Sequence, residues 1–279
     1  MSQKRHELSD TQWQILQPHL PKTSSKGGRP CKDHRLVINA ILWKLNTGAQ
    51  WRDLPERYGP WQTIYDRYSH WRKIGLWDKL VTVLLAELRK RDMLDTESFN
   101  INATYVRASR SAAGARKKGP DEPADHALGR SRGGYGTKVH ILTDANSIPL
   151  AVEVMAAQEH ESQHVEVLLD TVWIPGKVGH PLQRSEYVVG DKGYAGKRIR
   201  HAIESRGSTP IIPKKSNEKA EYYFDKELYR NRNVVERQIG WLKEKRSIGT
   251  RYCKLALNYL GFIVLGCICQ YLKLLEPVV

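Results

Sequence analysis

The sequence is poor in cysteine, and the few cysteines it has do not pair. Cys31, Cys253, Cys267 and Cys269 form no CxxC motif and no even framework within the 279 residues. This pattern argues against a disulfide scaffold and favours reduced thiols in the cytosol.

A secretory leader and an uninterrupted membrane-spanning run are also missing. The opening stretch MSQKRHELSD is polar throughout, unlike a signal peptide. The longest apolar run, residues 255–275, contains Asn258, Gln270 and Lys273, so we interpret it as a buried terminal helix. There are no internal repeats and no long low-complexity segment. We expect a cytoplasmic protein without a membrane partner.

Acidic side chains are in deficit. Lys and Arg number 45 against 30 Asp and Glu, a net charge of +15, and the pI is about 9.6. Such a balance favours a polyanionic partner, with counterion release as the driving force. A basic membrane-surface protein is the alternative. The 40% hydrophobic content suffices for a real core and allows two domains.

Residues 1–92 have the start and stop signals of short helices. Ser9 and Asp33 are candidate N-caps, Gly48 and Gly75 are candidate stops, and a further helix begins after Pro60. That helix has a core stripe of aromatic residues and a polar outer face made of Gln62, Thr63, Arg67, His70 and Lys73. We predict an all-helical, helix-turn-helix-like DNA-binding domain in which Gln62 and Arg67 contact DNA. An ordinary helical subdomain is the alternative.

Residues 93–279 predict a second, mixed α/β domain. Polar and apolar residues alternate from about residue 98, which predicts a strand, and a basic, Gly-rich loop covers 107–136. Further strands are expected at 137–143, 149–155, 186–190 and 209–212. Helices are expected at 162–173 and 195–206, then one that Asp225 caps and that carries Glu236, and a final one.

Four polar residues near the C-terminus share one helical face. Tyr229, Arg232, Glu236 and Lys243 fall within an arc of ~60° at about 100° per residue. A separate apolar stripe can bury the other side of the helix and consists of Leu228, Val235, Ile239 and Leu242. A lone carboxylate flanked by cations suits a metal site that meets a phosphate backbone.

Two further positions complete a candidate site for phosphoryl transfer. Asp191 follows an apolar strand and stands between Gly190 and Gly193, where active sites of α/β sheets collect, although it could instead be a simple N-cap. Two-metal catalysis needs several carboxylates, and the expected third place on the first strand holds Asn102. Asparagine offers a neutral carbonyl and cannot bridge two Mg²⁺ ions as aspartate does.

The spacing Y-(2)-R-(3)-E-(6)-K formed by Tyr229, Arg232, Glu236 and Lys243 resembles the signature of DDE transposases of bacterial insertion sequences, in the family-five subgroup. The phrases NATYVRASRSAAGA, GRSRGG followed by TKVH, GDKGY, and WRDLP through Trp71 also resemble that family. The resemblance covers nearly the full length.

The resemblance implies an RNase H-like catalytic core that binds Mg²⁺, with Mn²⁺ as a substitute. It implies a bacterial, nucleoid-associated enzyme that binds terminal inverted repeats, cuts there and joins the freed 3′-OH to target DNA. Asp191 and Glu236 would take the second and third acidic roles, and the first falls on Asn102. Tyr229, Arg232, Lys243 and Lys192 would contact DNA. Joining two ends favours a homodimer or higher oligomer.

Asn102 departs from the family and predicts a chain that binds DNA without cutting it. Either an intended Asp→Asn change traps an uncleaved complex, which the intact remainder of the site favours, or activity was lost naturally. Basic residues of the loop are expected to contact DNA phosphates, which predicts that salt weakens DNA binding. These residues are Arg107, Arg110, Lys117, Lys118, Arg130 and Arg132. A solvated, partly disordered loop is the alternative.

Three rival functions stay open. His160-Glu161-Ser162-Gln163-His164 matches the HExxH zinc-protease motif, but it begins just after a predicted strand, where a long central helix would be needed. A transposase-derived DNA-binding regulator would need neither Asp191 nor Glu236. A metal-dependent nuclease on the same fold would cut DNA without joining strands.

Overall fold

The computed structural model describes residues 5–22, 33–115, 119, 121–176, 179–218 and 221–276. Cys31, Lys117, Lys118 and most of the loop between the first two predicted helices lie outside these ranges.

The N-terminal region is helical, as predicted, and its caps are those that the sequence indicates. It contains α1 (Asp10–Leu16), α2 (His34–Thr47), α3 (Trp61–Lys73) and α4 (Leu76–Lys90), with 3-10 turns η1 (Gln17–His19), η2 (Trp51–Asp53) and η3 (Glu56–Tyr58). Ser9 forms a capping box with Gln12, and the Asp33 carboxylate accepts from the Arg35 N–H. Gly48 ends α2 in the left-handed conformation, with φ of 68°.

The rest of the chain is built on one mixed sheet. Its strands are β1 (Ser98–Arg107), β2 (Gly129–Ser131), β3 (Gly134–Thr143), β4 (Pro149–Ala156), β5 (Tyr187–Val189) and β6 (Thr209–Ile211). The order is β2-β3-β1-β5-β6, and β4 pairs with β3. β1 is antiparallel to β3 but parallel to β5, which is parallel to β6. This sheet and the helical region before it confirm the predicted fold class, an RNase H-like α/β core with N-terminal helices.

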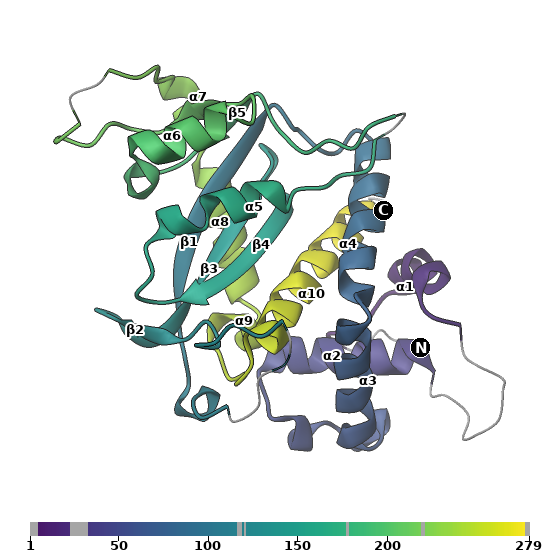
Figure 1. Cartoon of the computed structure of the whole chain (residues 1–279). Helices are drawn as coiled ribbons and strands as arrows, with labels where there is room; N and C mark the ends of the chain where they lie inside the picture. Colours follow the sequence, from purple (N-terminus) through teal and green to yellow (C-terminus); the bar gives the residue numbers. More distant parts are fainter. Residues whose placement is uncertain are drawn as a thin grey trace.

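Helices cover both faces of the sheet. Figure 1 shows α5 (Val165–Asp170) in front of it and α8 (Asn233–Lys243) behind it. The remaining helices are α6 (Lys197–Glu204), α7 (Lys226–Arg230), α9 (Arg246–Gly249) and α10 (Ala256–Leu275), and short turns are η4 (Arg110–Ala112), η5 (Glu161–Gln163) and η6 (Lys192–Tyr194).

The last helix belongs to the interior. Within the described ranges, α10 is the one helix whose length and composition would suit a membrane span. Most of its residues are nevertheless buried, and it packs against α4 and β4. Its Tyr271 hydroxyl donates to the Pro149 carbonyl, 2.5 Å away. This confirms the predicted buried terminal helix.

The helix predicted to carry the four polar residues is interrupted. Asp225 caps α7, as predicted, but α7 ends at Arg230 and α8 begins at Asn233. The prediction of one continuous helix is therefore wrong. Between the two helices the backbone forms tighter bonds three residues apart, such as Arg232 N–H to Tyr229 C=O at 3.1 Å. Asparagine on both sides of Arg232 is a weak helix former, which explains the break.

The predicted loop 107–136 is more ordered than expected, since η4, β2 and the start of β3 lie within it. Two buried charged residues fix its described part. The Glu122 carboxylate accepts from the Ala256 and Leu257 N–H groups at the start of α10, at 2.6 and 3.2 Å. The Arg251 guanidinium, with no exposed surface, donates to several oxygens, which are Ala127 O, His126 O, Cys253 O, Lys254 O and Thr137 Oγ1.

The N-terminal helices and the sheet share one apolar core. One cluster of buried side chains contains members from both regions, the first being Leu8 and the last Leu275. In addition, α10 contacts α2, α3 and α4 as well as β4. A side chain also crosses between the two regions, because Lys44 Nζ on α2 donates to Ser247 Oγ at 3.3 Å. The division into domains at residues 92 and 93 remains a prediction.

A buried histidine lies in the middle of the sheet. His140 on β3 has no exposed surface, and its ring lies 6.1 Å from that of Tyr194 and 6.0 Å from that of His164, between centroids. Burial, with the nearby charges of His164 and Lys138, lowers the pKa of His140 to about 3. The folded chain therefore holds this imidazole neutral.

We predict that Arg251→Met lowers the free energy of unfolding by about 3–5 kcal/mol, because five oxygens, in two buried and three part-buried hydrogen bonds, lose a charged donor. Urea denaturation followed by circular dichroism measures this. Arg237→Met, at an exposed position on α8, is the control and should change it by less than about 0.5 kcal/mol. Equal effects of the two substitutions would show that the Arg251 contacts do not stabilise the fold.

We also predict that His140 makes the protein sensitive to mild acid. In the unfolded chain His140 takes up a proton below its ordinary pKa of 6.5, whereas the folded chain does not until about pH 3. The contribution of His140 to the free energy of unfolding is therefore fully present above pH 6.5 and is lower by about 2 kcal/mol at pH 5. His140→Phe should remove that loss, as measured by urea denaturation at pH 7 and pH 5. The same loss in both proteins contradicts the prediction.

Candidate active site

The pairing of β1 with β5 brings Asn102 and Asp191 level with each other. The two strands are parallel, and Asn100 is in register with Val189. Asn102 and Asp191 each lie two residues further along, Asn102 in the middle of β1 and Asp191 just past the end of β5. The carboxyl end of a strand such as β5 is where polar side chains of α/β sheets gather into sites.

Glu236 lies on α8, the helix behind the sheet. At the end of α8, Lys243 Nζ donates to Thr104 Oγ1 at 2.7 Å and to Tyr105 O at 3.1 Å. Near the start of α8, the Ser147 hydroxyl donates to Val234 O at 2.6 Å, so the helix runs in the direction of β1. Glu236 precedes Lys243 by seven residues, roughly 10 Å of helix, and so lies from Lys243 in the direction in which Asn102 lies from Thr104.

The signature residues contact one another despite the break between α7 and α8. The Arg232 guanidinium pairs with the Glu236 carboxylate at 2.5 Å and lies 5.7 Å from the centre of the Tyr229 ring. The Glu236 side chain is half exposed. Lys243 is partly buried against β1, and this burial lowers its pKa. Arg232 thus neutralises the one carboxylate on this face, while Lys243 holds α8 to the first strand.

Asp191 has the N-cap role that the sequence allowed, and its role in a catalytic site remains a prediction. Its Oδ1 accepts from the Gly193 N–H at 2.7 Å and so caps the η6 turn. The residue is only partly buried. The cap orients the carboxylate at the strand end and leaves Oδ2 without a hydrogen-bond partner among the described residues.

Glu161 lies beside Asp191, and sequence analysis did not include it in the site. A Cβ atom built on Gly193 would lie 2.8 Å from Asp191 Oδ1 and 3.1 Å from Glu161 Oε2, so both carboxylates face this glycine. Burial and the charge of Asp191 raise the pKa of Glu161, while Lys138, 3.7 Å away, opposes the rise. The HExxH match had singled out Glu161, but as the general base of a zinc protease and not as a neighbour of Asp191.

The HExxH residues do not form a zinc-protease helix. His160 precedes a single 3-10 turn, not a long helix, and Glu161 pairs with Lys138. Both ring nitrogens of His164 are taken by carboxylates, Glu153 and Glu159, each at 2.8 Å. This hydrogen bonding raises the pKa of His164. Within the described ranges, no group of three or more His, Cys, Asp or Glu side chains is arranged to hold a metal ion, and position 102 itself offers an amide.

Exposed cations surround the carboxyl end of β1. Arg107 ends that strand, Arg110 lies in η4, Arg130 is in β2 and Arg132 follows β2; all are exposed, as is Lys192 after β5. The hairpin of β2 and β3 is tied to β1, because the Tyr105 hydroxyl donates to Gly133 O at 2.9 Å. These residues form a basic rim around the carboxyl end of β1, the strand that carries Asn102.

The two predicted contacts of the N-terminal region lie on α3, apart from this rim. Gln62 is exposed, whereas Arg67 is partly buried with its guanidinium 5.7 Å from the centre of the Trp71 ring. Ile64, Tyr68 and Trp71 of the aromatic stripe are core residues, as predicted.

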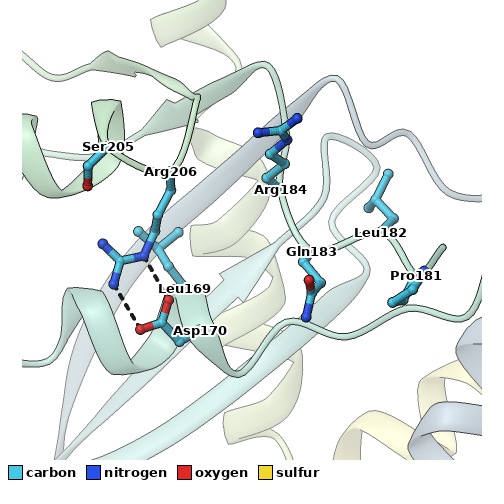
Figure 2. A pocket seen from close by; sticks show the side chains of 8 residues that line it. All are labelled: Leu169, Asp170, Pro181, Leu182, Gln183, Arg184, Ser205 and Arg206. Carbon is cyan, nitrogen blue, oxygen red and sulfur yellow. Dashed lines mark hydrogen bonds and ion pairs between the residues drawn. The ribbon is translucent and has the colours of Figure 1, made fainter.

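A separate hollow lies between the C-terminal ends of α5 and α6 and residues 181–184, and it contains none of the predicted site residues. It measures about 840 Å³, and Figure 2 shows Asp170 and Arg206 side by side along one edge of it. Two hydrogen bonds, of 2.7 and 2.8 Å, join them. This ion pair lowers the pKa of Asp170 and raises that of Arg206, so both charges are already matched.

Two family models match the chain. One, described as "Putative transposase of IS4/5 family", matches residues 8–81. The other, described as "Transposase DDE domain", matches residues 101–271 and so covers more than half of the chain.

Individual relatives agree with these matches. The chain is 37% identical over 155 residues to "Putative transposase for insertion sequence element IS402" of Burkholderia cepacia, covering 55% of this chain and 68% of that protein. It is 39% identical over 111 residues to "Uncharacterized protein y4sN" of Sinorhizobium fredii, covering 39% of this chain and 83% of that protein.

Among solved structures, the "Mos1 transposase paired-end complex with left transposon end" aligns over 83% of each chain, with 13% identity and a TM-score of 0.25; so low a score adds nothing to the argument. The match of the DDE domain across residues 101–271 and the IS402 relative are sufficient without it. Transposases with this domain are enzymes that generally depend on divalent metal ions. This chain belongs to the DDE transposases of bacterial insertion sequences.

Proposed function

We propose that the chain binds the terminal inverted repeats of its insertion sequence and that its fold is built to cut those ends and to transfer the 3′-OH to target DNA. The observation that supports this most is the strand register that makes Asn102 level with Asp191, while α8, the helix that carries Glu236, is bonded to the same strand β1 through Lys243. Three oxygen-bearing side chains that meet there, near a basic rim, would suit phosphoryl transfer on DNA.

We propose Mg²⁺ as the metal, with Mn²⁺ as a substitute, held by Asp191, Glu236 and the position of Asn102. Carboxylate and amide oxygens are hard ligands, which suits these ions better than softer metals. When bound, the metal would polarise the phosphate and activate the attacking water or hydroxyl. Arg232 pairs with Glu236 and would have to move toward the DNA phosphate for Glu236 to bind the metal.

For DNA, we propose that the basic rim contacts phosphates near the cut and that Tyr229, Arg232, Lys243 and Lys192 belong to the same surface. The N-terminal helices would contact DNA with Gln62 and Arg67 of α3. Joining two ends calls for a homodimer or a higher oligomer. The place of action would be the bacterial cytoplasm, at the nucleoid.

Asn102 favours a second candidate function, that of a DNA-binding regulator derived from a transposase. An amide in place of a carboxylate removes one negative charge from the metal site and cannot bridge two cations. The two functions differ in a simple respect: a regulator needs neither Asp191 nor Glu236. A nuclease on the same fold would cut without joining strands, and a strand-transfer assay separates it.

We predict that Asn102→Asp increases Mg²⁺-dependent cleavage of DNA carrying the element's ends by at least about 100-fold, because it restores the missing carboxylate. Gel assays of both proteins, with Mg²⁺, with Mn²⁺ and with a chelator, measure the change. Binding of the same DNA should be equal in both.

The matched control is the double variant Asn102→Asp with Asp191→Asn, which should bind DNA but not cut it. Cleavage at equal rates by the unchanged chain and by the single variant Asn102→Asp, or no cleavage by either protein, counts against the proposed site.

We further predict that DNA affinity falls steeply with salt, because the rim releases counterions from phosphates. Replacing Arg107, Arg110, Arg130 and Arg132 together by Gln should reduce the slope of log K against log[salt] by about 3 to 4. Fluorescence anisotropy of a labelled duplex from 50 to 300 mM KCl, roughly the range where such slopes are resolved, measures it.

As a control, the same exchange at four exposed lysines elsewhere should leave the slope nearly unchanged; these are Lys79, Lys90, Lys197 and Lys273. An equal reduction in both quadruple variants would mean that only net charge matters.

A further inference from the structure

A second large hollow lies between the N-terminal helices and the end of the catalytic core. It measures about 1460 Å³, and we call it the Tyr252 groove. One wall consists of η2 and the exposed side of α3, and the other consists of residues 109–115 after β1 and residues 252–255 before α10. Arg110 of the basic rim lies between Ser109 and Ser111, two residues that line the groove, so the rim and the groove are neighbours in the chain.

Aromatic rings line this groove. Tyr252 is 43% exposed, which is unusual for a large side chain. Trp61 and Tyr65 are the two members of the α3 stripe that the core does not bury fully, and both face the groove. Trp51 lies behind them, with its ring edge-on to Tyr65 at 5.6 Å between centroids. The stripe predicted as core is thus core on one side and groove lining on the other.

The groove is also cationic. Lys44, Arg52 and Lys254 line it against a single acid, Asp53. The Arg52 guanidinium lies 5.5 Å from the centre of the Trp61 ring. Lys44 is only 5% exposed, and no carboxylate of the described residues pairs with it; its Nζ donates to Ser247 Oγ and lies 5.9 Å from the Trp51 ring. Burial lowers the pKa of Lys44, so the cations available to an anionic ligand are Arg52 and Lys254.

The size of the groove and the chemistry of its lining residues limit the classes of ligand that it can bind. The volume exceeds the roughly 300–1,000 Å³ of small-molecule pockets, which favours a polymer. Cations suit its phosphates, and aromatic rings suit flat bases, since stacking on aromatic side chains beside a positive groove is how proteins hold single strands. In a duplex the base faces are covered by neighbouring pairs, so stacking requires unpaired nucleotides.

We propose that the Tyr252 groove binds a short single-stranded segment of DNA, with bases stacked on Tyr252 and Trp61 and phosphates against Arg52 and Lys254. The inference rests on the proposed function, because it assigns unpaired nucleotides to a second place on the same DNA-binding protein. Duplex DNA would occupy the basic rim, and unpaired nucleotides beside it would enter the groove.

The test compares single-stranded and duplex DNA on the full chain. Anisotropy measures the affinity for a labelled octathymidylate and, separately, for a labelled duplex. Tyr252→Ala should weaken binding of the octathymidylate by about 10-fold or more, as loss of one stacked base does, and should leave duplex affinity within about twofold. Tyr252→Phe keeps the ring and should bind the single strand like the unchanged chain. Tyr223→Ala, at a residue 61% exposed on another surface, is the control.

The outcomes separate this inference from the proposed function. Strong duplex binding with an octathymidylate affinity that Tyr252→Ala leaves unchanged overturns the groove but not the function. Absence of duplex binding overturns the function itself. Loss of self-association in Tyr252→Ala, seen by light scattering while single-strand binding is intact, would show that the groove holds a second copy of the chain and would also overturn the inference. Circular dichroism confirms that each variant is folded.

Discussion

The structure depends on one buried cation. Arg251 joins the end of β1, the loop before β2, the start of β3 and the turn before α10, because its guanidinium donates to oxygens in three of these segments and its backbone bonds to Arg107 O and to the Ser109 N–H. Burying a guanidinium is costly unless its donors are satisfied, and here all of its donor nitrogens have partners. The basic rim and one wall of the Tyr252 groove are therefore held by a residue that belongs to neither.

Local signals in the sequence predicted most of the fold. Ser9, Asp33 and Gly48 mark helix ends through their own hydrogen bonds or backbone conformation, so they could be recognised without tertiary information. The break before Asn233 could not, because the spacing of Tyr229, Arg232, Glu236 and Lys243 fits one continuous helix as well as the two helices observed. The order inside residues 107–136 was missed for a similar reason: Glu122 and Arg251 are distant in sequence from the groups they bind.

The candidate site shows the same limit. Asn102, Asp191 and Glu236 were assigned from spacing and family resemblance, and strand register then explains why Asn102 and Asp191 are level with each other. Glu161 could not be assigned in this way, since it reaches Asp191 through the packing of two short turns after different strands. The aromatic stripe of α3 was correctly predicted as core at Tyr68 and Trp71, but periodicity cannot tell that Trp61 and Tyr65 border a groove.

The position of α10 has a consequence for how the chain is made. Its side chains complete the core on which α2, α3, α4 and β4 all pack, yet it is the last of the described helices to leave the ribosome. Until then α2, α3 and α4 have only one another to cover their apolar faces, and the growing chain exposes surface that invites aggregation or chaperone binding. The complete core thus forms late in synthesis, and a product terminated before α10 would not contain it.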